Sequence, residues 1–147
     1  MSVLSPETGA REESELMSLI AMQRNIKFKF YDKQRKRLMD VISINWEQGI
    51  LECLFGGQRW ISLIEHGDLL QYTDRKDKYK KEIFEGHIIS EQDQFGVTPP
   101  KEVYWDDTVS GFRCRHGAYT GLLPDSKNME IIGTVYENPE LMTAEYD

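Results

Sequence analysis

The chain has 147 residues, a formal net charge of −7 and 39% hydrophobic residues, which fits one folded domain. Its two cysteines exclude a disulfide-stapled scaffold, and no apolar run approaches the roughly 20 residues that span a bilayer. The first residues lack the basic and apolar regions of a secretory signal. We therefore expect a cytoplasmic protein with no membrane partner.

Charge is divided unevenly along the chain. Residues 1–81 carry 14 Lys and Arg against 12 Asp and Glu, whereas residues 82–147 carry 4 against 13. Two basic stretches, at 24–37 and 75–81, would suit nucleic acid if the fold brought them together. They would equally suit solvated strands whose lysines prevent edge-to-edge pairing, and both interpretations stay open. The candidate nucleic-acid contacts are Arg24, Lys27, Lys29, Lys33, Arg35, Lys36, Arg37, Arg75, Lys76 and Lys78.

The N-terminal region, residues 1–23, predicts an arm followed by one amphipathic helix over 10–23. Acidic residues in an early turn of this helix complement its dipole. Apolar residues follow at helical spacing. We expect this apolar face either to bind a second copy of the chain or to cap an open end of the strands that follow. The candidate self-association residues are Leu16, Met17, Leu19 and Ile20.

From residue 27 the apolar pattern has a period of two, which predicts strands. Gly56-Gly57 predicts a two-residue hairpin turn, because both residues accept positive φ. We expect a β-meander over 24–68 and a barrel-like part over 69–147. The expected strands lie near 27–31, 38–46, 50–55, 59–64, 69–73, 82–89, 101–105, 112–115 and 129–136.

Three local features are expected in the second half. Residues 91–100 are polar and end in two prolines, which predicts an exposed loop. Gly133 interrupts the last strand and marks a possible bulge. Asn138-Pro139-Glu140 is typical of the start of a short helix, with Asn138 as the N-cap.

Residue types that bind metals or act in catalysis are present but scattered. Cys114-x-His116 would place two metal ligands on one face of a strand, whereas structural zinc needs four. The other candidates are Cys53, His66 and His87. Asp106-Asp107 precedes Thr108 and Gly111 and favours a hairpin turn over a carboxylate pair, since adjacent strand residues face opposite ways. The sequence predicts no metal site, no cofactor and no catalytic residue.

Four stretches carry a more specific signal. The first is RNIKFKFYD at 24–32, followed by RLM at 37–39. The second is LQYT at 70–73, KDK at 76–78 and KEIFEGHII at 81–89. The third is VYWDD at 103–107 with Gly111-Phe112, and the fourth is EIIGTVYENPELM at 130–142. In order and spacing they resemble the YopX family of phage and prophage proteins, from about Arg24 to Met142, with residues 1–23 outside the match.

The chain departs from this family pattern at three turns. Asp74 stands where the family usually has Gly, Tyr79-Lys80 where it has Asn-Gly, and His87 where it has Asp. Gly supplies positive φ and Asp a side-chain turn bond, so the conformation of these turns stays open. Region 40–68 shows no family signature.

The resemblance implies a small SH3-like β-barrel with additional elements, and self-association, but no established activity or catalytic residue. We expect an α+β, mainly β fold: an SH3-like barrel, an additional β-meander and an N-terminal helix. The expected function is a phage or prophage accessory protein of the bacterial cytoplasm, acting as a non-catalytic, oligomeric protein-binding module. The alternative is a nucleic-acid-binding regulator that uses the stretches at 24–37 and 75–81.

Overall fold

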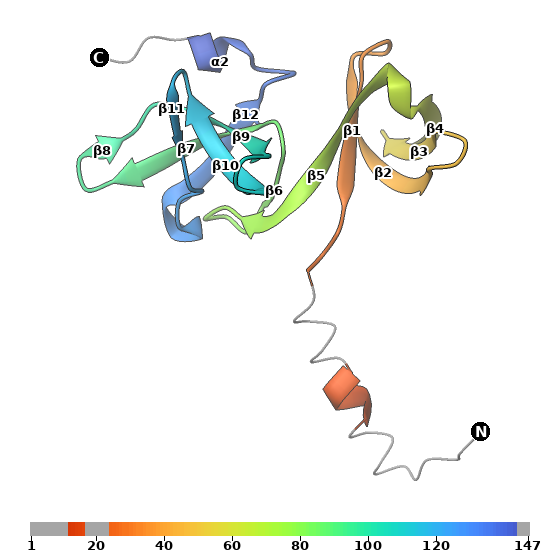
Figure 1. Cartoon of the computed structure of the whole chain (residues 1–147), viewed down its shortest axis with the longest axis horizontal. Coiled ribbons are helices and arrows are strands. Elements are labelled where there is room, and N and C mark those ends of the chain that lie inside the picture. Colours follow the sequence, from red (N-terminus) through yellow and green to blue (C-terminus); the bar gives the residue numbers. More distant parts are fainter. Residues whose placement is uncertain (1–11, 17–23, 144–147) are drawn as a thin grey trace.

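The computed structural model describes residues 12–16 and 24–143, and it is mainly β with two antiparallel sheets (Figure 1). The first sheet comprises β1 (Phe28–Asp32), β2 (Arg37–Asn45), β3 (Ile50–Phe55), β4 (Gln58–Leu63), β5 (Gly67–Lys76) and β6 (Glu82–Phe84). The second comprises β7 (His87–Asp93), β8 (Gly96–Val97), β9 (Lys101–Asp106), β10 (Gly111–His116), β11 (Tyr119–Gly121) and β12 (Met129–Thr134). The short helices are η1 (Ile64–His66), η2 (Ser126–Asn128) and α2 (Glu140–Thr143). None of the described helices is long and apolar enough to cross a membrane.

The predicted meander is confirmed in the first sheet. Its strand order is β4-β3-β2-β1-β5-β6, so β1 to β4 pair with their neighbours in sequence. The two-residue turn at Gly56-Gly57 joins β3 to β4, with φ values of 59° and 77°. A β-carbon is disfavoured at these angles, which explains the two glycines.

The boundary between the two halves differs from the expected one. β5 and β6, which the sequence assigned to the barrel-like part, extend the first sheet instead. β5 runs antiparallel to β1 from Gln71 opposite Phe28 to Gly67 opposite Asp32. The pairing gives β1 a partner on its second edge, which local patterning does not specify. The sheets therefore divide between Phe84 and His87.

The second sheet has the order β11-β10-β9-β7-β12, with β8 paired to β7. Among the described residues this order has two ends, at β11 and β12, so the hydrogen-bonded sheet is open and forms no closed barrel. The bulge expected at Gly133 is confirmed by a register shift between Ile131 and Gly133.

Two local expectations were wrong. Residues 91–100 are not a single loop, because β7 continues to Asp93 and turns back into β8. The side chain of Asn138 does not cap α2; its Oδ1 accepts a hydrogen bond from Thr134 N at 3.2 Å. That bond ties the C-terminal turn to the end of β12. Strand β11 was not predicted at all.

Each sheet has its own buried cluster. Phe30, Met39, Leu51 and Cys53 form the first, with Trp60 among the side chains packed around it. The second consists of Ile83, Ile89, Val103, Cys114 and Met129. Ile83 belongs to β6, so the first sheet also contributes to the core of the second.

The two sheets are joined by a contact at Tyr31. Its ring stacks on Tyr136, with ring centroids 4.3 Å apart. The Tyr136 hydroxyl donates to Asp68 Oδ2 at 3.0 Å. Burial, and to a lesser extent the negative charge of Asp68, raises the pKa of Tyr136. The junction is therefore both apolar and hydrogen-bonded.

The N-terminal helix is described in part. Residues 12–16 are helical, as predicted, and all five side chains are exposed. Leu16, the first residue of the apolar stripe, is 56% exposed. The rest of the predicted helix, including Met17, Leu19 and Ile20, lies outside the described residues.

Candidate binding surfaces

The first basic stretch is largely neutralised by acidic side chains. Lys27, just before β1, bonds Glu82 of β6 in the same sheet, and Lys29 lies 2.9 Å from Asp40. Lys33 pairs with Asp68 at 3.4 Å and Arg35 with Asp32 at 3.0 Å. Four of the candidate nucleic-acid contacts thus have a carboxylate beside them, which weakens any positive field they create.

Asp32 has a structural role in the hairpin turn that follows β1. Its Oδ1 accepts hydrogen bonds from the backbone N–H groups of Gln34 and Arg35, and Oδ2 accepts from Ser62 and Arg35. Burial favours the neutral acid, but these bonds outweigh it and hold the pKa of Asp32 below its usual value. Arg35 therefore stabilises the turn rather than facing a ligand.

The second basic stretch is held against the second sheet. Arg75 donates to the carbonyl of Pro124 at 2.6 Å, and Lys78 lies 3.4 Å from Glu130. The ion pair between Lys27 and Glu82 brings the second stretch close to the start of β1. Residues 33–37 of the first stretch lie at the opposite end of that strand. The fold thus brings the two stretches together only in part. Arg24 and Lys76 have no carboxylate partner among the described residues.

One cationic group of the first stretch has a different environment. The guanidinium of Arg37 lies 5.0 Å from the ring centroids of both Phe55 and Trp60. It makes no hydrogen bond and no ion pair with any described residue. Phe55 is 40% exposed, and the neighbouring Lys36 is exposed in the turn. We call Arg37, Phe55, Trp60 and Lys36 the Arg37 cluster.

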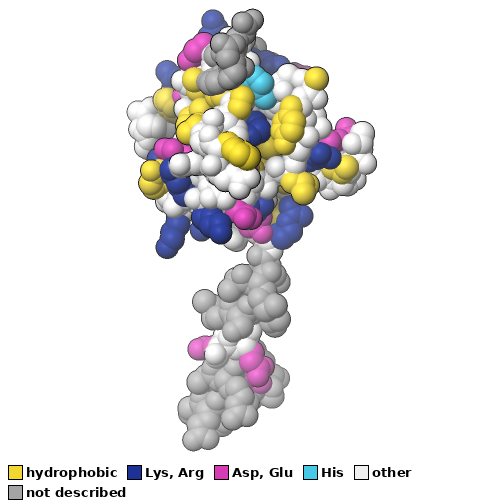
Figure 2. All heavy atoms as spheres, turned by 90° about the vertical axis from the view of Figure 1, so that its left-hand side faces the viewer, with side chains coloured by type: hydrophobic (Ala, Val, Ile, Leu, Met, Phe, Trp, Pro, Cys, Tyr) yellow, Lys and Arg dark blue, Asp and Glu magenta, His cyan; other side chains and the backbone are white. Residues whose placement is uncertain are grey.

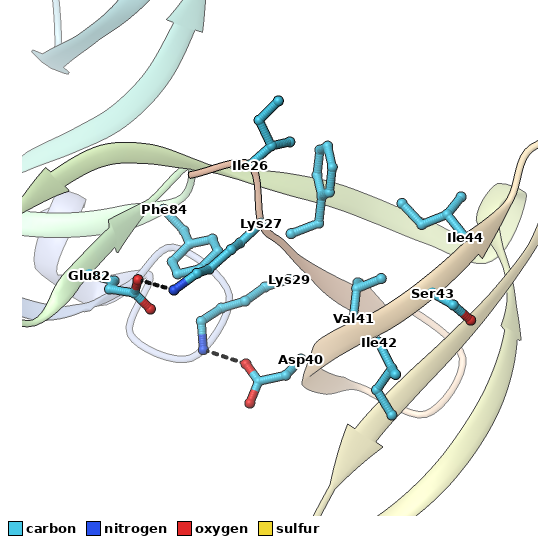
Figure 3. A pocket seen from close by; sticks show the side chains of 11 residues that line it. Ile26, Lys27, Lys29, Asp40, Val41, Ile42, Ser43, Ile44, Glu82 and Phe84 are labelled. Carbon is cyan, nitrogen blue, oxygen red and sulfur yellow. Dashed lines mark hydrogen bonds and ion pairs between the residues drawn. The ribbon is translucent and has the colours of Figure 1, made fainter. Parts of the chain in front are cut away.

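A groove opens where β1 and β2 separate (Figure 3). The ladder between these strands ends at Lys29 opposite Asp40. Beyond that point β2 pairs with β3 alone, and its register shifts between Val41 and Ser43. The bulge at Ile42 bends β2 away from β1. One edge of β2 therefore has no partner strand among the described residues over 41–45, and residues 41–44 line the groove.

The groove has apolar walls and a charged rim. Its volume is about 560 Å³. Figure 3 shows Lys27 directed at Glu82 and Lys29 directed at Asp40, so the rim charges are paired with one another. Exposed apolar side chains at its mouth include Ile26 (68%) and Ile42 (44%). The apolar lining consists of Ile26, Phe28, Val41, Ile42, Ile44 and Phe84.

The second sheet carries another apolar surface. Figure 2 shows hydrophobic side chains gathered on the face at the left of Figure 1, where β8 lies. Phe95 is 89% exposed and Val97 is 74% exposed in the β7–β8 hairpin. A groove of about 520 Å³ beside them contains the buried Lys101, whose Nζ lies 3.1 Å from Glu91 Oε1. This lysine is internally satisfied.

The candidate metal ligands do not converge. Cys53 lies in the first core and Cys114 in the second, while His116 Nδ1 bonds the carbonyl of Pro100 at 2.7 Å. Within 12–16 and 24–143, no group of three or more His, Cys, Asp or Glu residues could hold a metal ion. Burial raises the pKa of Cys53 to about 11, so its thiol stays protonated near neutral pH.

The carboxylates at 106 and 107 stabilise the turn between β9 and β10, as predicted. Asp106 Oδ1 accepts from the backbone N–H of Thr108 at 2.9 Å, and Asp107 Oδ1 accepts from the indole N–H of Trp105 at 2.8 Å. The hydrogen bonds from Thr108 lower the pKa of Asp106. The two acids thus serve separate local roles.

Of the three departures from the family pattern, only Tyr79-Lys80 lies in a turn; Asp74 lies within β5, at its register shift between Tyr72 and Arg75, and His87 is the first residue of β7. Asp74 and Lys80 adopt positive φ, 63° and 64°, where the family usually has Gly. At His87 the ring Nδ1 accepts a hydrogen bond from Phe84 N at 2.8 Å. Burial, with a further contribution from Lys29, lowers the pKa of His87 to about 4. The imidazole of His87 is therefore neutral near pH 7, which leaves Nδ1 without a proton and able to accept this hydrogen bond.

The family motif around Asp77 anchors one sheet on the other. Asp77 is 3% exposed, and its carboxylate accepts hydrogen bonds from the backbone N–H groups of Tyr79, Lys81 and Ile131. The first two close the turn before β6, and the third reaches β12. Burial raises the pKa of Asp77, but these bonds outweigh it and leave it below the usual value.

Sequence reasoning missed the groove and the aromatic members of the Arg37 cluster. Both depend on strand pairings that bring distant residues together. One local signal was available: Val41-Ile42 breaks the apolar alternation of β2, and two adjacent apolar residues in a half-buried strand are typical of a bulge. Phe55 and Trp60 lie next to the Gly56-Gly57 turn and carried no signal of their own.

A sequence model of the YopX protein family matches residues 12–143. The chain belongs to this family, as its motifs indicated. The match begins at residue 12, so it includes the described helical residues 12–16, which we had placed outside the family pattern. No curated protein matches the chain.

A solved structure has the same fold. Protein EF1440 from Enterococcus faecalis is similar, with a TM-score of 0.56 and 20% sequence identity. The alignment covers 82% of this chain and 99% of that protein. At this identity the likeness concerns the fold.

Proposed function

We propose that the protein is a non-catalytic protein-binding module of phage or prophage type, acting in the bacterial cytoplasm. The observation that carries the proposal is the groove between β1 and β2. Its walls are apolar, and within 12–16 and 24–143 no strand pairs with one edge of β2 over residues 41–45. Proteins bind extended segments at such edges through backbone hydrogen bonds, with side chains seated in neighbouring apolar pockets.

The charge pattern supports protein over nucleic acid as the partner. Five of the ten basic candidate residues pair with carboxylates: Lys27, Lys29, Lys33, Arg35 and Lys78. The whole chain carries a net charge of −7. Nucleic-acid binding depends on cations that replace the counterions of the phosphates, and paired lysines do this poorly.

The proposal includes an SH3-like relationship for the second sheet. Its support is a set of short antiparallel strands around one buried cluster. The proposal also includes self-association, which the exposed Leu16 supports.

Affinity capture from bacterial lysate, followed by mass spectrometry, tests the groove as a protein-binding site. The Ile42→Asp variant alters an exposed wall of the groove, and Ile61→Asp is its matched control. Ile61 is 59% exposed on β4 and does not line the groove. We expect Ile42→Asp to lose a captured protein that the wild-type chain and Ile61→Asp retain. Equal capture by both variants would contradict the groove as the site.

A gel-shift titration tests the alternative function. We expect no retardation of single- or double-stranded DNA or RNA at low salt. Retardation that declines steeply as salt is raised would support the nucleic-acid-binding regulator instead.

A further inference from the structure

The Arg37 cluster combines a cation without a counter-charge and an apolar aromatic surface. The guanidinium of Arg37 lies over the rings of Phe55 and Trp60 and has no carboxylate or hydrogen-bonding partner among the described residues. A guanidinium held on aromatic rings keeps its planar set of N–H donors, which match the two oxygens of a carboxylate. The site therefore suits an acidic group beside an apolar one.

The helical turn at residues 12–16 has the complementary features. Glu12, Glu15 and Leu16 lie at spacings of three and four residues, so they share one face of the helix. All are exposed, and the two carboxylates form no ion pair with another described residue. Leu16 is 56% exposed. This face of the helix therefore presents two carboxylates beside an apolar side chain.

We propose that the helical turn Glu12–Leu16 of one copy docks on the Arg37 cluster of a second copy. The carboxylates of Glu12 and Glu15 face Arg37 and Lys36, and Leu16 packs on Phe55. Each chain carries both surfaces, so two reciprocal contacts close a two-fold dimer. The inference rests on the proposed function as a protein-binding module, and it names a second copy of the chain as one partner.

A single-stranded nucleic acid is the other ligand that aromatic rings and arginines recognise. The structure favours the acidic helix for two reasons. The carboxylates of Glu12 and Glu15 have no counter-charge among the described residues, and the net charge of −7 opposes a polyanion. The site is also small in charge. The other two basic residues at 33–37 of the first hairpin, Lys33 and Arg35, already pair with carboxylates.

Charge reversal in two separate variants tests the docking. The cluster variant is Arg37→Glu, and the helix variant carries Glu12→Lys and Glu15→Lys. We expect gel filtration with light scattering to give a dimeric mass for the wild-type chain at low salt and a monomeric mass for each variant alone. Each variant should weaken self-association by at least about tenfold, because like charges then oppose each other.

An equimolar mixture of the two variants gives the decisive result. In the mixed dimer, the acidic cluster of the Arg37→Glu chain faces the basic helix of the Glu12→Lys, Glu15→Lys chain. The second contact of that dimer pairs an unchanged helix with an unchanged cluster. We therefore expect the mixture to regain the dimeric mass. Recovery in the mixture also shows that both variants are folded. Arg59→Glu is the control, because Arg59 is exposed and pairs with Glu52 on another part of the sheet.

Three results would overturn the docking. They are a monomeric wild-type chain at low salt, a variant that alone keeps the wild-type mass, and a mixture that stays monomeric. If circular dichroism shows that Arg37→Glu is unfolded, Lys36→Glu in the exposed turn replaces it with the same expectations. An oligonucleotide retarded by the wild-type chain but not by Arg37→Glu would assign the cluster to nucleic acid. Loss of capture by the groove variant Ile42→Asp leaves all of these outcomes unchanged, so the two proposals fail separately.

Discussion

The family motif at 70–89 and the region 40–68, which has no family signature, are built in different ways. In the motif, buried polar groups reach across the molecule: Asp77 holds β12, and Gly86 bonds both Val103 and Val135 through its backbone. In region 40–68 the strands pair with their neighbours and leave Ile42, Leu54 and Ile61 exposed.

The contrast separates structural residues from accessible ones. Residues that join distant strands, such as Asp77, contribute to the stability of the fold, and they belong to the recognisable pattern. The open edge of β2 at 41–45 and the exposed Ile42 lie outside that pattern, and there we propose that partners bind. The following substitutions test this difference by comparing the two regions, from the largest expected effect to the smallest.

Removal of the Asp77 carboxylate should cause the largest loss of stability. Asp77→Ala leaves three backbone N–H groups without their acceptor, and each such buried donor costs about 1–3 kcal/mol. We expect the free energy of unfolding, measured by urea titration, to fall by about 4 kcal/mol. Asp93→Ala is the matched control, because Asp93 accepts one bond in an exposed turn. A loss below 1 kcal/mol for Asp77→Ala would contradict its role as an anchor.

Stability should fall as the pH drops from 6.5 toward 4, because in this range His87 is protonated in the unfolded chain and neutral in the folded one. The pKa of His87 is lowered from 6.5 to about 4, so the unfolded chain binds a proton between these pH values that the folded chain does not. The contribution is complete above pH 6.5 and is lost as the pH falls toward 4, by about 3 kcal/mol in total. Subtracting the pH profile of His87→Asn from that of the wild-type chain isolates this effect. Parallel profiles would show that His87 titrates normally.

Two glycines with positive φ should respond differently to alanine. Gly86 has a φ of 84°, and a β-carbon there would lie 3.0 Å from the ring of Tyr136. Gly57 has a φ of 77°, with nothing within 4 Å of such a β-carbon. Both substitutions strain the backbone by about 1 kcal/mol. Because of the contact with Tyr136, we expect Gly86→Ala to lower the free energy of unfolding by about 2 kcal/mol more than Gly57→Ala does. Thermal unfolding of both variants measures this difference.

Glycine at position 80 should stabilise the fold. Lys80 has a φ of 64°, which costs a non-glycine residue about 1–2 kcal/mol. The greater freedom of glycine in the unfolded chain offsets part of this gain. We expect Lys80→Gly to raise the free energy of unfolding by about 0.5 kcal/mol. Lys76→Gly, within strand β5, should lower it.

The sequence predicted those parts of the fold that depend on local patterning. The alternation at 27–31 and the Gly56-Gly57 turn located the meander, and Gly133 located a bulge. The pairing of β5 with β1 could not be predicted, because an alternating strand specifies which face is buried and not which strand lies beside it. The same limit concealed the opposite charges beside Lys27 and Lys33, whose partners Glu82 and Asp68 are distant in sequence.

The candidate site shows the same division. Positive φ at Asp74 and Lys80 agrees with the glycines that the family has there. The groove could not be predicted, because it exists only where β1 leaves β2 for β5. Asn138 was misassigned because its side chain can reach either the helix or the strand, and the close approach at Gly133 leaves space for the second arrangement.

The most direct test measures binding and stability together in two variants. Ile42→Asp changes the groove, and Asp77→Ala changes the motif; both are compared at a temperature where circular dichroism shows them folded. The account predicts that Ile42→Asp loses the captured protein and keeps its free energy of unfolding within about 1 kcal/mol, whereas Asp77→Ala keeps capture and loses stability. Capture that depends on Asp77 and not on Ile42 would contradict it.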